Sequence, residues 1–308
     1  MNMIQTFYHI IVPILIPIAI GALLHRKFRF DLGGFSKMIL YYYVPALAFV
    51  KIYEARLPFR VLLSVFGFLI LQLVVMIFIG FLISRIMRYS PGMSASFANS
   101  VTLTNNGNVG IPVNSMAFHQ NPAAMSIQVI VVVFELFVTF TYGVLNAGKA
   151  RAGLKKSLAD FARMPVLYAI LAGTLFHTFN MTLPEPLLSP LEGIADGMLP
   201  FALATIGAQI VSSKWHRDTA RAVLLSSFTR LILAPLCAYV IIQLLDLHGL
   251  TAQALFIASA IPTSRNSAAL ALEYDNEPGF AAQAVLVSTL LSSLTLTVVI
   301  DLAGVWFA

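Results

Sequence analysis

Charged side chains are scarce in this chain. They account for 10% of its 308 residues, whereas 59% of the residues are hydrophobic. Soluble domains carry about 25% charged residues, because their surfaces face water. A chain with so few charges cannot cover a water-facing surface, so the composition favours a surface that faces lipid.

Cysteines and catalytic motifs are also largely missing. The single cysteine, Cys237, lies in an apolar run, which excludes a disulfide framework. We find no cysteine–histidine cluster, Ser-His-Asp set or nucleotide-binding loop, and therefore expect neither an enzyme nor a bound metal or cofactor. The first apolar run has no basic region before it, so we expect a membrane span there and no cleaved signal peptide.

Long apolar segments are what the sequence contains instead. A hydrocarbon core about 30 Å thick needs roughly 20 apolar residues per helix. On that scale we predict an all-α polytopic membrane protein with ten transmembrane helices, numbered spans 1 to 10. They cover residues 4–24, 34–50, 61–84, 94–117, 124–146, 164–180, 189–212, 222–244, 251–272 and 280–306. Their connections are short; the longest, 148–163, is basic and is expected to form a short amphipathic surface helix.

The basic residues indicate the orientation of these spans. Of the nineteen lysines and arginines, thirteen lie in the loops after odd-numbered spans and three in the loops after even-numbered spans. Positive loops stay in the cytoplasm. We therefore predict a multi-pass protein of the cytoplasmic membrane with both termini outside. The net charge of +6 follows mostly from this bias, so nucleic-acid binding is not expected.

The two halves of the chain resemble each other. Six of thirteen positions match when span 1 from Pro13 is aligned with span 6 from Pro165, and seven of ten match between Leu62–Leu71 and Leu224–Leu233. The interior prolines of spans 2 and 7 are a third match in the same order. We predict two five-helix repeats, 1–147 and 164–308, joined by the loop 148–163. An odd number of spans inverts the second repeat, an arrangement typical of secondary transporters with a midplane binding site.

Span 4 contains a stretch that is poor helix material. Two glycines, three asparagines and a proline lie between Thr104 and Pro112. In a helix interior glycine costs about 1 kcal/mol and proline about 3 kcal/mol relative to alanine. Freed backbone groups at membrane depth are tolerated only in a protein interior or at a polar cavity. The stretch therefore predicts a broken helix beside a cavity; the alternative interpretation is a re-entrant loop or a structural kink.

Span 9 has a matching polar stretch at 260–267. Aligning Phe97 with Phe256 also brings Thr104 opposite Thr263. Half-helix ends carry partial charges, positive at N-termini and negative at C-termini. Two breaks that meet at the midplane would offer donors, acceptors and amide side chains together, a set that suits a small polar substrate.

Three motifs resemble those of the auxin efflux carrier family. They are N-x-G-N-x-G-x-P (105–112), G-x-x-P-x-A-L-A-x-I-G-x-x-I (197–210) and A-I-P-x-x-x-N-x-x-x-L-A-x-E-Y (260–274). The resemblance implies the fold of bile-acid symporters and sodium/proton antiporters, with scaffold spans 1, 2, 6 and 7. It also implies a mobile transport domain of spans 3–5 and 8–10, in which spans 4 and 9 cross, and a homodimer formed through the scaffold. The short central loop indicates a bacterial-type member, a group proposed to move malonate and other small organic acids.

Three ionisable residues lie inside predicted spans and are candidates for function. Arg265, at the span 9 break, could bind a carboxylate bidentately or serve as a fixed cation; the alternative is a structural ion pair. Glu135 and Arg230 are interpreted first as a buried structural pair. Alternatively, Glu135 carries a coupling proton.

The sequence thus predicts a secondary active carrier of small organic anions (carboxylates) that works by elevator-like alternating access, with coupling to H⁺ or Na⁺ left open. The predicted binding residues are Asn105, Asn106, Gly107, Asn108, Gly110, Pro112, Pro262, Thr263, Ser264, Arg265, Asn266, Ser267, Pro45 and Pro200. One rival is a monovalent cation/proton exchanger on the same fold, but neither break contains an acidic residue. The other is a non-transporting membrane sensor, for which no segment is long enough to form a signalling domain.

Overall fold

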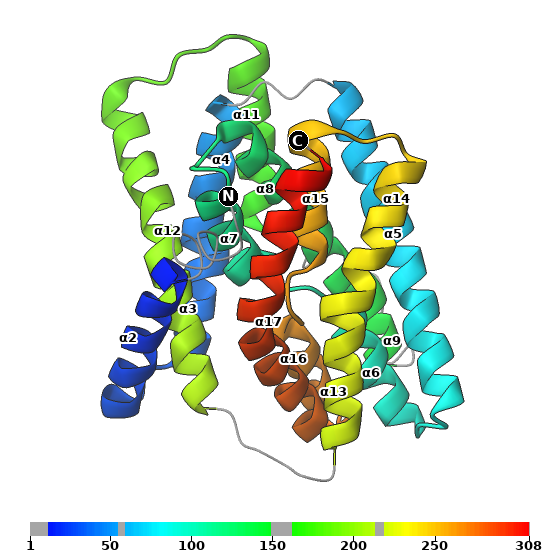
Figure 1. The fold of residues 1–308 in the computed structure, drawn as a ribbon. Coiled ribbons are helices and arrows are strands. Elements are labelled where there is room, and N and C mark those ends of the chain that lie inside the picture. Colours follow the sequence, from blue (N-terminus) through cyan, green and yellow to red (C-terminus); the bar gives the residue numbers. More distant parts are fainter. Residues whose placement is uncertain (1–11, 55–58, 149–161, 213–218, 308) are drawn as a thin grey trace.

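The computed structural model describes residues 12–54, 59–148, 162–212 and 219–307, and these are almost entirely helical (Figure 1). Helices lie at all ten predicted spans. In chain order they are α2 (Val12–Phe28), α3 (Leu32–Met38), η2 (Ile39–Tyr43), α4 (Val44–Glu54), α5 (Phe59–Ile86), α6 (Pro91–Thr102), η3 (Asn106–Gly110), α7 (Ile111–Ala117), α8 (Pro122–Val138), η4 (Thr139–Gly143), α9 (Val144–Gly148), α11 (Pro165–Thr178), α12 (Glu185–Ser212), α13 (Ala220–Phe228), η5 (Thr229–Leu233), α14 (Ala234–Leu244), α15 (Gly249–Ser259), α16 (Arg265–Glu273) and α17 (Pro278–Trp306). The elements η2 to η5 are π-helical turns. The surface helix predicted in 148–163 falls almost wholly outside the described residues.

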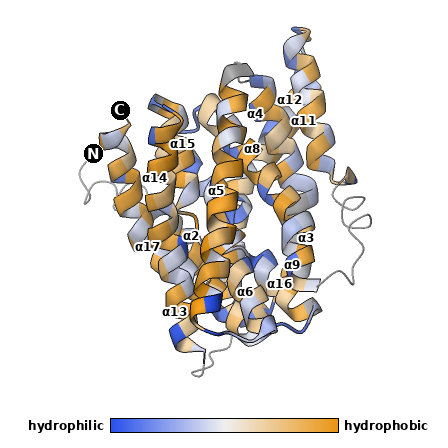
Figure 2. Ribbon diagram, turned by 90° about the vertical axis from the view of Figure 1, so that its right-hand side faces the viewer, coloured by the Kyte–Doolittle hydropathy of each residue, from blue (hydrophilic) through white to orange (hydrophobic). Residues whose placement is uncertain are grey.

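The outer helices present an apolar face suited to lipid (Figure 2). On α5 this face is a stripe of large side chains, each 44–61% exposed, at three- and four-residue spacing: Leu63, Phe66, Ile70, Val74, Phe78 and Phe81. Such a stripe occupies one side of a helix with 3.6 residues per turn. In water it would be costly, whereas in a bilayer it faces hydrocarbon.

Within the described ranges, five helical stretches are long and apolar enough to cross a membrane: Val61–Ile86, Pro122–Gly148, Glu185–Ser212, Ala220–Leu244 and Pro278–Trp306. The helices at the other predicted spans are shorter, or are interrupted by non-helical residues or π-helical turns. The chain is therefore a multi-pass membrane protein. The full count of ten spans and their inverted relation stay predictions.

The helices form two groups, seen in Figure 1 with α2 and α12 on the left and α5, α13 and α14 on the right. In the first group α2 packs along α12, and α11 packs along α4. In the second group α5, α13, α14 and α17 pack against the interrupted spans 4 and 9, while α8 touches both groups. The assignment of these two groups to a scaffold and a transport domain stays a prediction from the sequence.

Close helix contacts in the first group support the internal repeat. A Cβ on Gly21 of α2 would overlap the backbone of Ala204 in α12, and a Cβ on Gly173 of α11 would lie 3.0 Å from the carbonyl oxygen of Phe49 in α4. Gly21 and Gly173 occupy matching positions in the aligned halves, and Phe49 and Ala204 each lie four residues after an interior proline. The two contacts thus involve matching glycines, while the internal repeat itself stays a prediction.

The connections alternate between the two ends of the helices. In Figure 1 the α5–α6 and α16–α17 connections lie at the bottom, and the α14–α15 connection lies at the top. Connections after odd-numbered spans 3 and 9 thus share one end, opposite the connection after span 8. Which end faces the cytoplasm stays a prediction from the basic residues.

Candidate functional site

Span 4 is interrupted where its asparagines and glycines gather. The helix α6 ends at Thr102, and Leu103 is extended, with φ −84° and ψ 122°. Helical structure resumes at Asn106 in η3, and α7 follows with Pro112 in its first turn. Proline has no N–H group to donate within a helix. It is tolerated there because the regular α-helical hydrogen bonds are already interrupted where η3 meets α7. The predicted broken helix is present at 103–105.

Span 9 is interrupted in the same way. The helix α15 ends at Ser259 and α16 begins at Arg265. Between them Pro262 lacks an N–H donor and restricts the residue before it, which prevents a continuous helix. The Ser264 side chain caps α16, because its Oγ accepts a hydrogen bond from the Asn266 N–H group at 3.2 Å.

The two interruptions bond to each other through their backbones. The Asn105 N–H group donates to the Pro262 carbonyl oxygen at 2.9 Å, and the Ser264 N–H group donates to the Leu103 carbonyl oxygen at 2.8 Å. These bonds flank a single antiparallel bridge between residues 104 and 263. Backbone groups freed by the breaks are thus satisfied inside the protein, as the apolar surroundings require. We call this paired region, residues 103–106 and 260–264, the crossing.

Arg230 binds the C-terminal ends of the helices that lead into the crossing. It lies in η5 and is 2% exposed. Its Nε donates to the Ile261 carbonyl oxygen at 3.0 Å and its Nη1 to the Val101 carbonyl oxygen at 3.2 Å, while Nη2 donates to the Ser259 carbonyl oxygen. The last carbonyls of a helix carry partial negative charge. One guanidinium therefore neutralises the ends of both α6 and α15.

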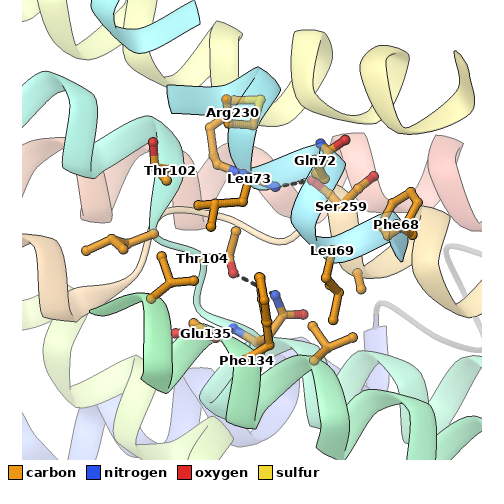
Figure 3. A pocket seen from close by; sticks show the side chains of 16 residues that line it. Phe68, Leu69, Gln72, Leu73, Thr102, Thr104, Phe134, Glu135, Arg230 and Ser259 are labelled. Atoms are coloured by element: carbon orange, nitrogen blue, oxygen red, sulfur yellow. Dashed lines mark hydrogen bonds between the residues drawn. The ribbon is translucent and has the colours of Figure 1, made fainter. Parts of the chain in front are cut away.

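Glu135 binds the opposite ends, where the second half-helices begin. Its Oε2 accepts a hydrogen bond from the Asn106 N–H group at 2.8 Å, and its Oε1 accepts one from the Ser264 hydroxyl at 3.3 Å. Helix N-termini carry partial positive charge, so a carboxyl group suits this position. Figure 3 shows Arg230 and Glu135 on opposite sides of Thr104.

Glu135 and Arg230 form no salt bridge with each other in the described part of the chain, so their interpretation as a buried structural pair stays a prediction. The ion pairs among the described residues lie elsewhere in the chain. The two side chains instead bond to opposite helix ends of the crossing, so the backbone lies between them. Both line a small cavity of about 60 Å³ whose other walls are mainly apolar (Figure 3).

A larger cavity of about 280 Å³ is also lined by residues of the crossing, among them Asn105 and Ser264. We call it the crossing cavity. One wall is formed by α3, η2 and α4 of the first helix group, and the opposite wall by η3, α8, η4 and α16. Six predicted binding residues line it: Asn105, Gly107, Asn108, Ser264, Arg265 and Asn266. The cavity therefore combines amide, hydroxyl and guanidinium groups at the boundary between the two groups of helices.

The remaining predicted binding residues lie outside the lining of the crossing cavity: Asn106, Gly110, Pro112, Pro262, Thr263, Ser267, Pro45 and Pro200. Several of them hold the crossing together, as when Thr263 Oγ1 donates to the Ser100 carbonyl oxygen at 2.8 Å. Val44 lines the cavity, and the next residue, Pro45, points about 100° away from it around the helix. Pro200 is exposed. The two prolines thus shape spans 2 and 7 without facing the cavity.

Two cationic side chains line the crossing cavity. Arg265 is half-buried at the start of α16, and Lys37 approaches from α3. Neither forms an ion pair with an acidic side chain of the described residues. Glu135 also lines the cavity, but its two oxygens accept hydrogen bonds from the crossing. Lys37 was missed as a site residue, although a lysine inside an apolar span is itself a signal.

A second missed residue, Gln128 of α8, fixes the break in span 4. Its Nε2 donates to Asn106 Oδ1 at 3.0 Å and to the Asn106 carbonyl oxygen at 3.2 Å. The Asn106 amide in turn donates to Thr104 Oγ1 at 2.7 Å. A Cβ on Gly110 would overlap both Gln128 Nε2 and Asn106 Oδ1. Gly110 is therefore required by this hydrogen-bonded network.

The four π-helical turns in the described part of the chain gather around the site. Residues of η2, η3 and η4 line the crossing cavity, and η5 carries Arg230. Such turns insert one residue into an α-helix and occur often at functional sites. Among described residues they add Thr139 and Phe140 of η4 to the cavity wall. Sequence periodicity gave no signal for these turns, because an inserted residue shifts the helical register without changing the composition.

Comparison with known proteins agrees with this architecture. A family model described as membrane transport protein matches residues 149–300. An uncharacterized transporter of Methanothermobacter thermautotrophicus is 22% identical over 275 residues, which cover 86% of this chain and 87% of that protein. An uncharacterized transporter of Methanocaldococcus jannaschii is 24% identical over 198 residues, 63% of each chain. These matches indicate a transporter and not an enzyme.

Proposed function

We propose that this chain, whose second half belongs to the membrane transport protein family, is a secondary active carrier of small organic anions. The observation that carries the proposal is Arg265. Its side chain lines a cavity of about 280 Å³ and forms no ion pair with the described acidic residues. Arg265 is half-buried, and a partly desolvated guanidinium without a paired counter-charge costs free energy that a bound anion would offset.

The chemistry of the crossing cavity favours a carboxylate. A guanidinium presents two parallel N–H donors that match the two oxygens of a carboxylate. Lys37 supplies a second positive charge from the opposite wall, and the half-buried Asn108 and Asn266 supply amide donors. The apolar walls, which include Val132 and Leu136, suit the hydrocarbon part of a small organic acid.

The position of the cavity favours an elevator-like mechanism. One wall belongs to the helix group of α4, and the other includes the crossing, which two backbone hydrogen bonds and the side chains of Arg230 and Glu135 hold together. A crossing fixed in this way would move as a rigid unit past α4, carrying the anion with it. We propose coupling to H⁺ or Na⁺, with Glu135 as the candidate proton carrier.

The membrane setting completes the proposal. The basic residues support a location in the cytoplasmic membrane with both termini outside. A homodimer formed through the scaffold is part of the proposal and rests on the family resemblance. A cation/proton exchanger is less well supported, because the two free charges in the cavity are positive.

The test is ligand-dependent thermal stabilisation of the purified full-length protein. Mono- and dicarboxylates are screened with and without sodium, using the wild type, Arg265→Gln and the matched control Arg29→Gln. We expect at least one carboxylate to raise the melting temperature of the wild type and of Arg29→Gln but not of Arg265→Gln. Stabilisation by sodium alone, with no carboxylate effect, would instead favour the exchanger.

A further inference from the structure

A third cavity, of about 680 Å³, lies where α5 meets α6. Its walls are the last turns of α5, the first two turns of α6, and residues of η4 and α9. It shares no lining residue with the crossing cavity. The anion carrier proposed above makes no use of it.

The cavity is charged at one end and apolar at the other. Arg85 and Arg88, both exposed, lie at the end of α5, whereas Ile77 and Phe81 lie farther into the span. From residue 77 to the end of α5 at residue 86 the helix rises by roughly 14 Å, since each residue adds about 1.5 Å. That distance is comparable to a phospholipid headgroup together with the first part of its acyl chains.

A buried polar atom also points to a ligand. Ser84 is 5% exposed and lines the cavity, and its Oγ has no hydrogen-bond partner among the described residues. An unsatisfied buried hydroxyl costs free energy unless something binds to it. A phosphate oxygen would accept its proton. The nearby Tyr89 and Ser94 add two more hydroxyl groups to the same wall.

The cavity is open toward the lipid-facing side. Phe81 is 58% exposed and belongs to the apolar stripe of α5, and Leu145 on the other rim is 40% exposed. A lipid could therefore enter sideways while its headgroup stays at the interface. The basic residues predict that this end of the helices faces the cytoplasm, where the leaflet contains anionic lipids.

We infer that this cavity is a binding site for an anionic phospholipid, with Arg85 and Arg88 on the phosphate and Ser84 as a hydrogen-bond donor beneath it. The apolar wall from Ile77 to Phe81 takes the upper acyl chains. Each arginine near the membrane surface contributes about fivefold in affinity for an anionic lipid, so the pair contributes roughly 25-fold.

Native mass spectrometry of the full-length protein, with phosphatidylglycerol and phosphatidylcholine of matched acyl chains, tests the inference. We expect the wild type to retain phosphatidylglycerol preferentially. Arg85→Gln with Arg88→Gln should reduce that preference by roughly 25-fold. The control, Arg26→Gln with Arg29→Gln, removes the same charge from another loop predicted on the same side and should keep it.

Three results would overturn the inference. One is a wild type without preference between the two lipids, and another is an equal loss of preference in both double variants. The third is displacement of phosphatidylglycerol by millimolar inorganic phosphate, which would assign the arginines to a soluble anion. Ser84→Ala, which removes only the hydroxyl, should weaken retention without changing the charge.

Discussion

Arg230→Met tests whether one buried guanidinium holds both half-helix ends of the crossing. The substitution removes hydrogen bonds to the carbonyl oxygens of Val101, Ser259 and Ile261 and leaves these groups buried. Each unsatisfied buried group costs about 1–3 kcal/mol, so the gross loss is roughly 3–9 kcal/mol. Methionine also avoids the cost of burying a charge, which offsets part of that loss. We therefore expect a net loss near the lower end, about 3 kcal/mol.

The assay is thermal unfolding of the purified protein. A loss of about 3 kcal/mol, at about 2 °C per kcal/mol, predicts a fall in melting temperature of at least about 6 °C. Arg221→Met is the matched control, because Arg221 lies on the adjoining helix α13 and is exposed. It should change the melting temperature by less than about 1 °C. Equal melting temperatures for the two variants would refute the assigned role of Arg230.

Two further substitutions test neighbouring parts of the crossing. Gly110→Ala should lower the melting temperature and reduce transport strongly, because its Cβ would overlap Gln128 and Asn106. Gly107→Ala is the control, since only Val132 comes within 4 Å of a Cβ there; equal effects of the two variants on melting would contradict the hydrogen-bonded network. Glu135→Gln should leave the melting temperature nearly unchanged, because an amide can still accept from the Asn106 N–H group and donate to a hydroxyl. If Glu135 carries the coupling proton, the same variant should lose the dependence of transport on a pH gradient, and retained dependence would show that its role is structural.

Much of the architecture could be predicted from apolar segment lengths and from breaks in them. Glycine, asparagine and proline have high costs in a helix interior, so their concentration at 104–112 and 260–267 located both interruptions. The alignment of Thr104 with Thr263 correctly placed them opposite each other, where the structure has an antiparallel bridge. These features depend on the helix propensity of individual residues and on the similarity of the two halves, and both can be read from a single sequence.

What the sequence could not show is which way each side chain points. Asn105 and Asn106 are adjacent and chemically identical, yet Asn105 lines the cavity while Asn106 bonds to Gln128 behind it. Two buried charges, Glu135 and Arg230, suggested a mutual pair because opposite charges attract. Their hydrogen-bond partners are backbone groups at helix ends and, for Glu135, also the Ser264 hydroxyl, and the composition of the sequence does not identify these partners. The π-helical turns could not be predicted either, because an inserted residue shifts the helical register without changing the composition.

The exchange of a labelled carboxylate across proteoliposomes tests the central claim most directly. The substrate is the carboxylate that stabilises the wild type, and uptake is driven by the same unlabelled anion inside. We predict exchange by the wild type and by Arg29→Gln, and a loss of at least about tenfold in Arg265→Gln, the effect of about 1.4 kcal/mol of lost binding. Exchange by Arg265→Gln at the wild-type rate and with the wild-type half-saturation concentration would contradict an anion site at the crossing.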